Sequence, residues 1–228
     1  MGEMVEFPSN GTTGTGYLAV PASGTGPGVV VIQEWWGLNQ QIKEVADRLA
    51  GAGFVALVPD LYRGKITTAE DEAGQLMMSL NIEQAAKDMA GAVDYLKGHG
   101  AVTGDGVGVT GFCMGGGLAL WLATLRPDDV KAAVPYYGVI PWPAAQPDWS
   151  KLRAPVQGHY AEGDDFAPPD SARELEQELR GHGVDVEIFI YPGCGHAFSN
   201  HHRPEVFHEE HSNTAWDRTI EFFRANLG

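Results

Sequence analysis

The sequence predicts a single α/β domain over residues 1–228, with a mostly parallel central sheet of about seven to eight strands and helices on both faces. Strand-like segments alternate with segments of helical spacing, and no repeat, low-complexity tract or linker interrupts them. One strand-like segment, Gly28–Gln33, is apolar almost throughout, as expected of a strand buried on both faces of a parallel sheet. The length of 228 residues fits one large domain or two small ones, and the unbroken alternation favours one.

The first part of the chain contains three expected strands and one helix. Tyr17–Val20 has strand character and ends at a region rich in proline and glycine. After Gly28–Gln33, the polar loop Glu34–Asn39 leads into Gln40–Ala52, whose apolar residues recur at helical spacing. Phe54–Val58 is the next expected strand.

The middle of the chain predicts a long helical stretch and then a strand followed by a helix. Thr67–Gly98 has helical spacing and divides into two helices near Ser79–Asn81. The β-branched run Val107–Thr110 predicts a strand. Met114–Leu125 predicts the helix that follows it, and Pro127 stops that helix.

The last part of the chain continues the alternation. Expected strands cover Ala132–Gly138, Ala154–Tyr160 and Val184–Tyr191. Expected helices cover Ser171–Arg180 and Glu205–Leu227, and Val139–Pro147 is a proline-rich loop.

Charge and composition exclude several classes of protein. Acidic residues outnumber basic ones 30 to 15, giving a net charge of −15, which argues against a nucleic-acid or anionic membrane surface as partner. No run of 18 apolar residues predicts a membrane span, and the N-terminal segment lacks the basic and apolar regions of a signal peptide. Two cysteines cannot build a disulfide framework, so we expect free thiols and a cytoplasmic location.

A strand, a sharp turn and a helix meet around the first of these cysteines. The pentapeptide is Gly111-Phe112-Cys113-Met114-Gly115, which has the G-x-S-x-G spacing of a nucleophile elbow with cysteine in place of serine. Glycine on both sides suits a turn in which a Cβ would clash with the neighbouring strand or helix. The helix N-terminus would favour thiolate at Cys113. The alternative is a buried structural cysteine beside a glycine-rich turn.

Four reactive side chains follow the carboxyl ends of expected strands, where open α/β sheets bind their ligands. They are Glu34, Cys113, Asp164 or Asp165, and His196. Taken singly, the histidine could be structural, the aspartate a turn or cap residue and the glutamate a salt-bridge partner. The chain order nucleophile, acid, histidine is nevertheless that of a hydrolase triad, so together they predict a catalytic site.

Further motifs stand at intervals along nearly the whole chain. They are Gln33-Glu34-Trp35-Trp36-Gly37-Leu38-Asn39, Pro59-Asp60-Leu61-Tyr62, the elbow, Tyr136-Tyr137-Gly138, Gly163-Asp164-Asp165-Phe166, Gly195-His196-Ala197-Phe198 and Ala215-Trp216-Asp217-Arg218-Thr219. Together they resemble the dienelactone hydrolase family, a cysteine-nucleophile branch of the α/β-hydrolases. The resemblance implies the α/β-hydrolase fold and hydrolysis of small esters or lactones without a cofactor.

The resemblance also implies roles for individual residues. Cys113 corresponds to the nucleophile, His196 to the general base and acid, and Asp164 to the carboxylate that orients it. Glu34 corresponds to a glutamate that contacts the resting thiol and helps to ionise it when substrate binds, so we expect a largely neutral thiol at rest. The backbone N–H groups of Trp35 and Met114 correspond to the oxyanion hole.

The chain departs from the family pattern where substrate is bound. One family arginine follows the Asp-Leu-Tyr motif, where Arg63 stands, and another follows the histidine by four residues, where this chain has Asn200. Losing a guanidinium removes a strong contact to a substrate carboxylate, and Arg203 is a possible replacement. The substrate is therefore either dienelactone or another ester, lactone or thioester.

Aromatic residues on loops at the same end of the sheet are expected to line the substrate pocket, with ordinary packing as the alternative. The residues taken as substrate-binding are Trp36, Tyr137 and Phe166, together with Arg63 and Asn200. His201, His202, His208 and His211 straddle a loop and the start of a helix, without a cysteine or a consistent facing pair, so no metal is expected. Cys194 is taken as a small free residue.

The sequence thus predicts an esterase or lactonase with a Cys-His-Asp triad and a small-molecule substrate. The alternatives are a broad carboxylesterase or thioesterase and a non-catalytic binding scaffold. The chain is expected to be a monomer or a small homo-oligomer.

Overall fold

The computed structural model describes residues 2–228, which form one eight-stranded sheet in the order β1-β2-β4-β3-β5-β6-β7-β8. The strands are β1 (Glu3–Ser9), β2 (Thr12–Ala19), β3 (Gly26–Ile32), β4 (Val55–Pro59), β5 (Val102–Phe112), β6 (Val130–Tyr136), β7 (Val156–Ala161) and β8 (Val186–Tyr191). The pairs β1–β2 and β2–β4 are antiparallel and all other neighbouring pairs are parallel. The predicted mostly parallel sheet is confirmed.

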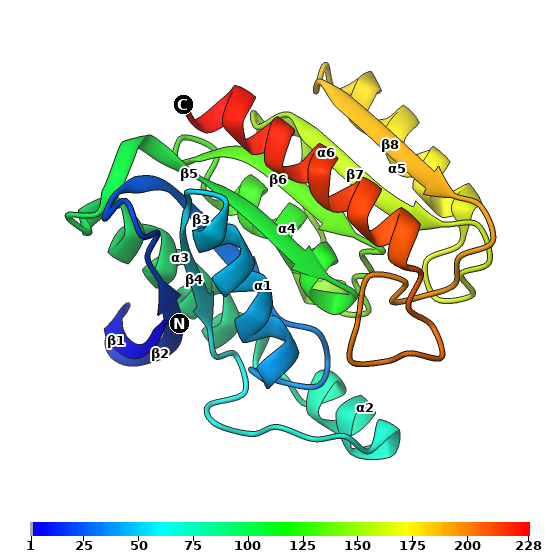
Figure 1. Cartoon of the computed structure of the whole chain (residues 1–228). Helices are drawn as coiled ribbons and strands as arrows, with labels where there is room; N and C mark the ends of the chain where they lie inside the picture. The colour runs from blue at the N-terminus through cyan, green and yellow to red at the C-terminus, as the bar shows by residue number, and fades with distance from the viewer. Residues whose placement is uncertain (1) are drawn as a thin grey trace.

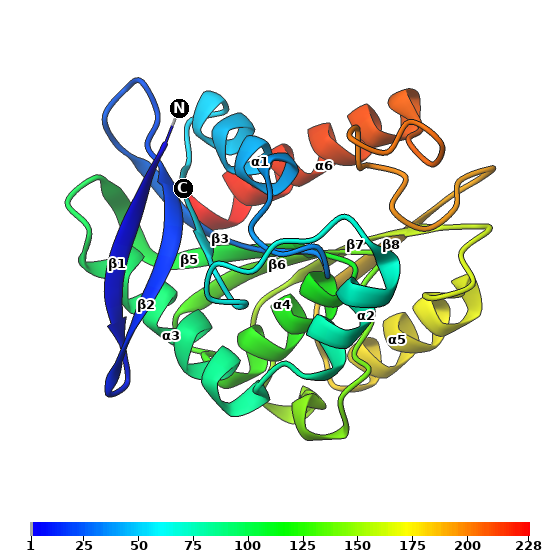
Figure 2. The same cartoon turned by 90° about the horizontal axis from the view of Figure 1, so that it is seen from below.

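Helices cover both faces of this sheet. They are α1 (Gln40–Gly51), α2 (Glu70–Met78), α3 (Ile82–Gly98), α4 (Met114–Leu125), α5 (Pro169–Gly181) and α6 (Glu209–Leu227). Figure 1 shows α1 and α6 in front of the sheet, and Figure 2 shows them on one side with α3, α4 and α5 on the other. None of the helices in residues 2–228 combines the length and hydropathy that a membrane span requires.

Two apolar cores separate these layers, one on each face of the sheet. Alternate residues of the central strands point to opposite cores. In β3, for example, Val30 and Ile32 pack with α3 and α4, whereas Val29 and Val31 pack with α1 and α6. Burial on both faces explains why this strand is continuously apolar in the sequence.

Local signals located most elements, and the differences lie mainly at their ends. The helix Met114–Leu125 and the break between α2 and α3 agree with expectation. The N-terminal strand β1 was missed, although it joins β2 through Asn10-Gly11, both at positive φ, which is a frequent hairpin turn. The last helix begins at Glu209 rather than Glu205, because His208 caps it by accepting from the His211 N–H. Strand β5 extends beyond Val107–Thr110 in both directions.

The register of the parallel strands brings their carboxyl ends to one edge. Ile32 of β3 pairs with Gly111 of β5, and Phe112 of β5 pairs with Tyr136 of β6. The residues that follow β3, β5 and β6 therefore emerge side by side, and Glu34, Cys113 and Tyr137 are among them.

Candidate active site

Cys113 lies on a strained turn between β5 and α4. Its backbone has φ 55° and ψ −122°, a conformation that costs a non-glycine residue free energy and is typical of functional turns. The flanking glycines make the turn possible. A Cβ on residue 111 would lie 2.1 Å from the Gly115 carbonyl oxygen, and one on residue 115 would lie 2.4 Å from that of Ile32. The elbow geometry expected from the pentapeptide is present.

The Cys113 thiol is buried, with 8% of the residue exposed. Burial raises the pKa of this thiol well above its ordinary value, and the negative charge of Glu34 raises it further. A hydrogen bond from the Met114 N–H lowers the same pKa without reversing the shift. The neutral thiol is therefore the stable form at neutral pH, and this agrees with the expected resting state. The effect of burial on the pKa of Cys113 is therefore larger than that of the helix N-terminus, which favours the thiolate.

His196 and Asp164 form a hydrogen-bonded pair. His196 Nδ1 lies 2.8 Å from Asp164 Oδ2, and the other carboxylate oxygen accepts from the N–H groups of Phe166 and Ala167 at 2.8 and 2.9 Å. Burial raises the pKa of Asp164, but the hydrogen bond and charge of His196 together with these N–H donors hold it below its usual value. Because Asp164 occupies Nδ1, Nε2 remains for chemistry. Asp165, the alternative from sequence, lines the cavity instead.

Glu34 is buried, 3% exposed, and its two oxygens have different donors. Asn200 Nδ2 donates to Oε2 at 2.8 Å, and the Tyr137 hydroxyl donates to Oε1 at 3.3 Å. Burial raises the pKa of Glu34, an effect only partly offset by the nearby charge of His196 and by these two donors. Asn200 and Tyr137 thus hold this carboxyl group and are not themselves among the residues lining the cavity.

A cavity of about 280 Å³ joins these groups. Its lining includes Glu34, Trp35, Trp36, Glu70, Met77, Cys113, Val139, Phe166, His196 and Arg203. Phe166 is 69% exposed, and its ring lies 5.2 Å from that of His196. Trp36 lines the cavity as expected, Trp35 lines it as well, and Met114 follows Cys113 in the elbow.

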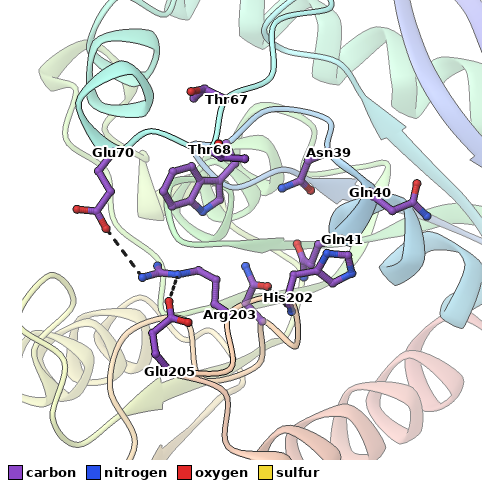
Figure 3. A pocket seen from close by; sticks show the side chains of 11 residues that line it. Asn39, Gln40, Gln41, Thr67, Thr68, Glu70, His202, Arg203 and Glu205 are labelled. Carbon is purple, nitrogen blue, oxygen red and sulfur yellow. Dashed lines mark hydrogen bonds and ion pairs between the residues drawn. The ribbon is translucent and has the colours of Figure 1, made fainter.

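The two candidate arginines lie in different places. Arg63 is not part of this cavity, because its guanidinium pairs with Asp88 at 3.1 Å, and its expected role in substrate binding has no support in the geometry. Arg203 does line the cavity. Figure 3 shows it between Glu70 and Glu205, at 3.9 and 2.8 Å.

Arg203 also borders a second cavity, of about 570 Å³. Trp36 and Glu70 line both cavities, and the Arg203 guanidinium lies 5.7 Å from the centre of the Trp36 ring. These three side chains therefore separate the space beside Cys113 from the more open space near α1.

Comparison of the sequence with models of known protein families identifies its family. The model of the dienelactone hydrolase family matches residues 15–227. The chain belongs to the dienelactone hydrolase family.

Two relatives match this chain along their whole length. The protein usf of Aquifex pyrophilus is 39% identical over 100% of both chains, and a putative carboxymethylenebutenolidase of Aquifex aeolicus is 35% identical over 100% of both. The structure of a putative dienelactone hydrolase from Klebsiella pneumoniae superposes with a TM-score of 0.88 at 29% identity, covering 98% of each chain. The α/β-hydrolase fold and the classification as a hydrolase are thereby confirmed.

Some residues that line the cavity beside Cys113 were not predicted from the sequence. Glu70 and Met77 reach the cavity from α2, and Val206 reaches it from the segment before α6. No local motif marks them, because their place depends on how α2 packs over the edge of the sheet. The pairing of Asn200 with Glu34 was also missed, since these residues lie far apart in the sequence.

Proposed function

We propose that this protein hydrolyses small carboxylic esters or lactones through a Cys113-His196-Asp164 triad and an acyl-cysteine intermediate. One observation carries the proposal. Cys113 stands on a strained elbow and lines the same cavity as His196, whose Nδ1 is bonded to Asp164 at 2.8 Å. A nucleophile, a base and an orienting carboxylate are the parts that acyl transfer requires.

In the proposed first half-reaction, the Cys113 thiol loses its proton to His196 and Sγ attacks the carbonyl carbon. The N–H groups of Met114 and Trp35 stabilise the resulting oxyanion, each contributing roughly 3 kcal/mol. The C–O bond then breaks, and the imidazolium returns the proton to the leaving alkoxide. A lactone keeps this alcohol tethered to the acyl group.

Water completes the proposed cycle. His196 takes a proton from water, the hydroxide attacks the thioester carbonyl, and the C–S bond breaks. The carboxylic acid product leaves and Cys113 is reprotonated. Between cycles burial keeps the thiol neutral, and the negative charge of Glu34 further opposes ionisation of the buried sulfur.

Substitution of the triad tests this proposal. Cys113→Ala and His196→Ala should each lower hydrolysis of an activated short-chain ester by roughly 10³-fold or more, with an unchanged circular dichroism spectrum. His182→Ala is the matched control for His196→Ala, since His182 is an exposed histidine outside the cavity, and it should retain activity. Mass spectrometry of the quenched wild-type enzyme should find the acyl group on Cys113. Full activity in either triad variant would contradict the triad, whereas no turnover of any ester by the wild type would favour the binding scaffold.

Arg203 supplies a second test, directed at substrate class. It is the one arginine or lysine lining the cavity in residues 2–228, and three carboxyl groups, Glu34, Glu70 and Asp165, line it as well. If the substrate carries a carboxylate, Arg203→Gln should lower kcat/KM for dienelactone by about 10- to 100-fold while changing a neutral ester little. Arg63→Gln is the control, because Asp88 holds that guanidinium elsewhere. Equal losses for both substrates would contradict recognition of a carboxylate by Arg203.

A further inference from the structure

The fold brings Cys194 together with two histidines that are distant in the sequence. One ligand atom from each of Cys194, His208 and His211 lies within 4.8 Å of the other two. The His208 and His211 rings stack at 4.3 Å with an interplanar angle of 20°. The cysteine is buried and the histidines are half-buried, so a metal ion could reach the group from solvent on the side of the histidines.

These three side chains match the needs of a transition metal. A tetrahedral zinc with bonds of about 2.3 Å to sulfur and 2.0–2.1 Å to nitrogen places its ligand atoms roughly 3.5 Å apart. Side-chain rotations that move the three ligand atoms by about 1 Å would bring them to this separation. One thiolate and two imidazoles are ligands that zinc prefers over magnesium or calcium. We propose that Cys194, His208 and His211 bind Zn²⁺, with water in the fourth position.

The position of the group suggests what the metal does. Cys194 and His208 lie near the two ends of the segment between β8 and α6, which carries His196, Asn200 and Arg203. The Cys194 carbonyl oxygen also accepts from the Gly163 N–H at 2.8 Å, next to Asp164. A metal at this point would fasten both ends of a long loop and so restrict the loop that positions the catalytic histidine.

A second cluster, Glu44 with His201 and His202, lacks a thiol and serves as an internal comparison. Both imidazoles already bond Glu44 Oε2, each at 2.8 Å, so its geometry is explained without a metal. By contrast, the Cys194 thiol has no hydrogen-bond partner among residues 2–228, and the His208 ring makes one long bond, 3.4 Å, to the His211 N–H.

Cobalt is the probe that separates the two clusters, because Co²⁺ bound to a thiolate gives a charge-transfer absorption that nitrogen and oxygen ligands do not. Titration is carried out on full-length Cys113→Ala, in which Cys194 is the single thiol. We expect one Co²⁺ per chain with this absorption, displaced by Zn²⁺. A chain without the nucleophile is used, so the result is independent of the proposed catalytic function.

Histidine variants in the same background define the site. His211→Gln should weaken Co²⁺ binding at least tenfold, and so should His208→Asn, which removes a ligand while retaining a good N-cap for α6. His202→Gln, in the second cluster, is the matched control and should not change the absorption. Saturating Zn²⁺, at about 100 times its Kd, should raise the Tm by about 5–10 °C, and EDTA should reverse the rise. Absence of the thiolate absorption, or its persistence with unchanged affinity in His211→Gln, would overturn the proposal.

Discussion

At the scale of single residues, the site depends on how burial changes charge. Cys113 and Glu34 are both buried side by side at the ends of neighbouring strands, and burial opposes ionisation of each. Asp164 is equally hidden, yet two N–H donors and His196 keep it ionised. Three acidic groups within one site therefore have different protonation behaviour, and local donors account for the difference.

Replacing Glu34 tests its effect on the thiol. Because the charge of Glu34 raises the pKa of Cys113, Glu34→Gln should lower that pKa and move the pH profile of Cys113 alkylation to lower pH, with a several-fold faster reaction at neutral pH. The measurement is the rate of iodoacetamide labelling against pH, followed by mass spectrometry. Asp165→Asn, another carboxyl group of the cavity, should leave the profile unchanged. An unchanged profile in Glu34→Gln would show that Glu34 carries no charge at rest.

At the scale of elements, the turn that joins β5 to α4 is possible because residues 111 and 115 are glycines. Backbone atoms occupy the space that a Cβ at either position would need. The bounds of α4 followed from sequence, since its apolar residues begin directly after the turn and stop before Pro127. The hairpin strand β1 did not, because its residues are largely exposed and give no apolar pattern. Sequence patterns therefore locate an element best where the core requires apolar residues.

A single methyl group should disrupt the elbow. In Gly115→Ala the new Cβ would lie 2.4 Å from the carbonyl oxygens of both Ile32 and Gln33, which are backbone atoms that cannot move aside cheaply. We expect the free energy of unfolding to fall by about 2–4 kcal/mol and ester hydrolysis to be largely lost. Urea unfolding measures the first effect.

Gly74→Ala, in the middle of α2, is the matched control for that substitution. The new methyl group would meet no heavy atom within 4 Å outside its own helix backbone and chain neighbours, so this change should stabilise the protein by roughly 0.5–1 kcal/mol. Equal stability changes at positions 115 and 74 would contradict a steric role for the elbow glycine.

At the scale of the whole molecule, α6 joins the sheet through a buried polar cluster. The His159 ring in β7 contacts the hydroxyls of Tyr191 and Thr219 at 2.9 and 3.1 Å. Burial, helped by the charge of Arg218, lowers the pKa of His159 to about 3. Its unfolded-state pKa is about 6.5. Between these two pKa values the unfolded chain therefore binds a proton that the folded protein does not bind.

Acid should therefore destabilise the fold through this histidine. Its contribution is complete above about pH 6.5 and is lost as the pH falls towards about 3. When the pH is lowered from 7 to 5, the free energy of unfolding measured by urea denaturation should fall by about 2 kcal/mol less in His159→Gln than in the wild type. His182→Gln, at an exposed histidine, should follow wild type. Parallel curves for wild type and His159→Gln would contradict this assignment.

The sequence alone determined the alternation of elements, the family resemblance, the elbow and the candidate side chains at strand ends, because these are encoded by residue type and short spacing. The tertiary structure decided which distant groups meet. It brought Asn200 to Glu34, Arg203 rather than Arg63 to the cavity, and Cys194 to His208 and His211. The physical reason is that such contacts depend on loop paths and packing between elements, which no local pattern specifies.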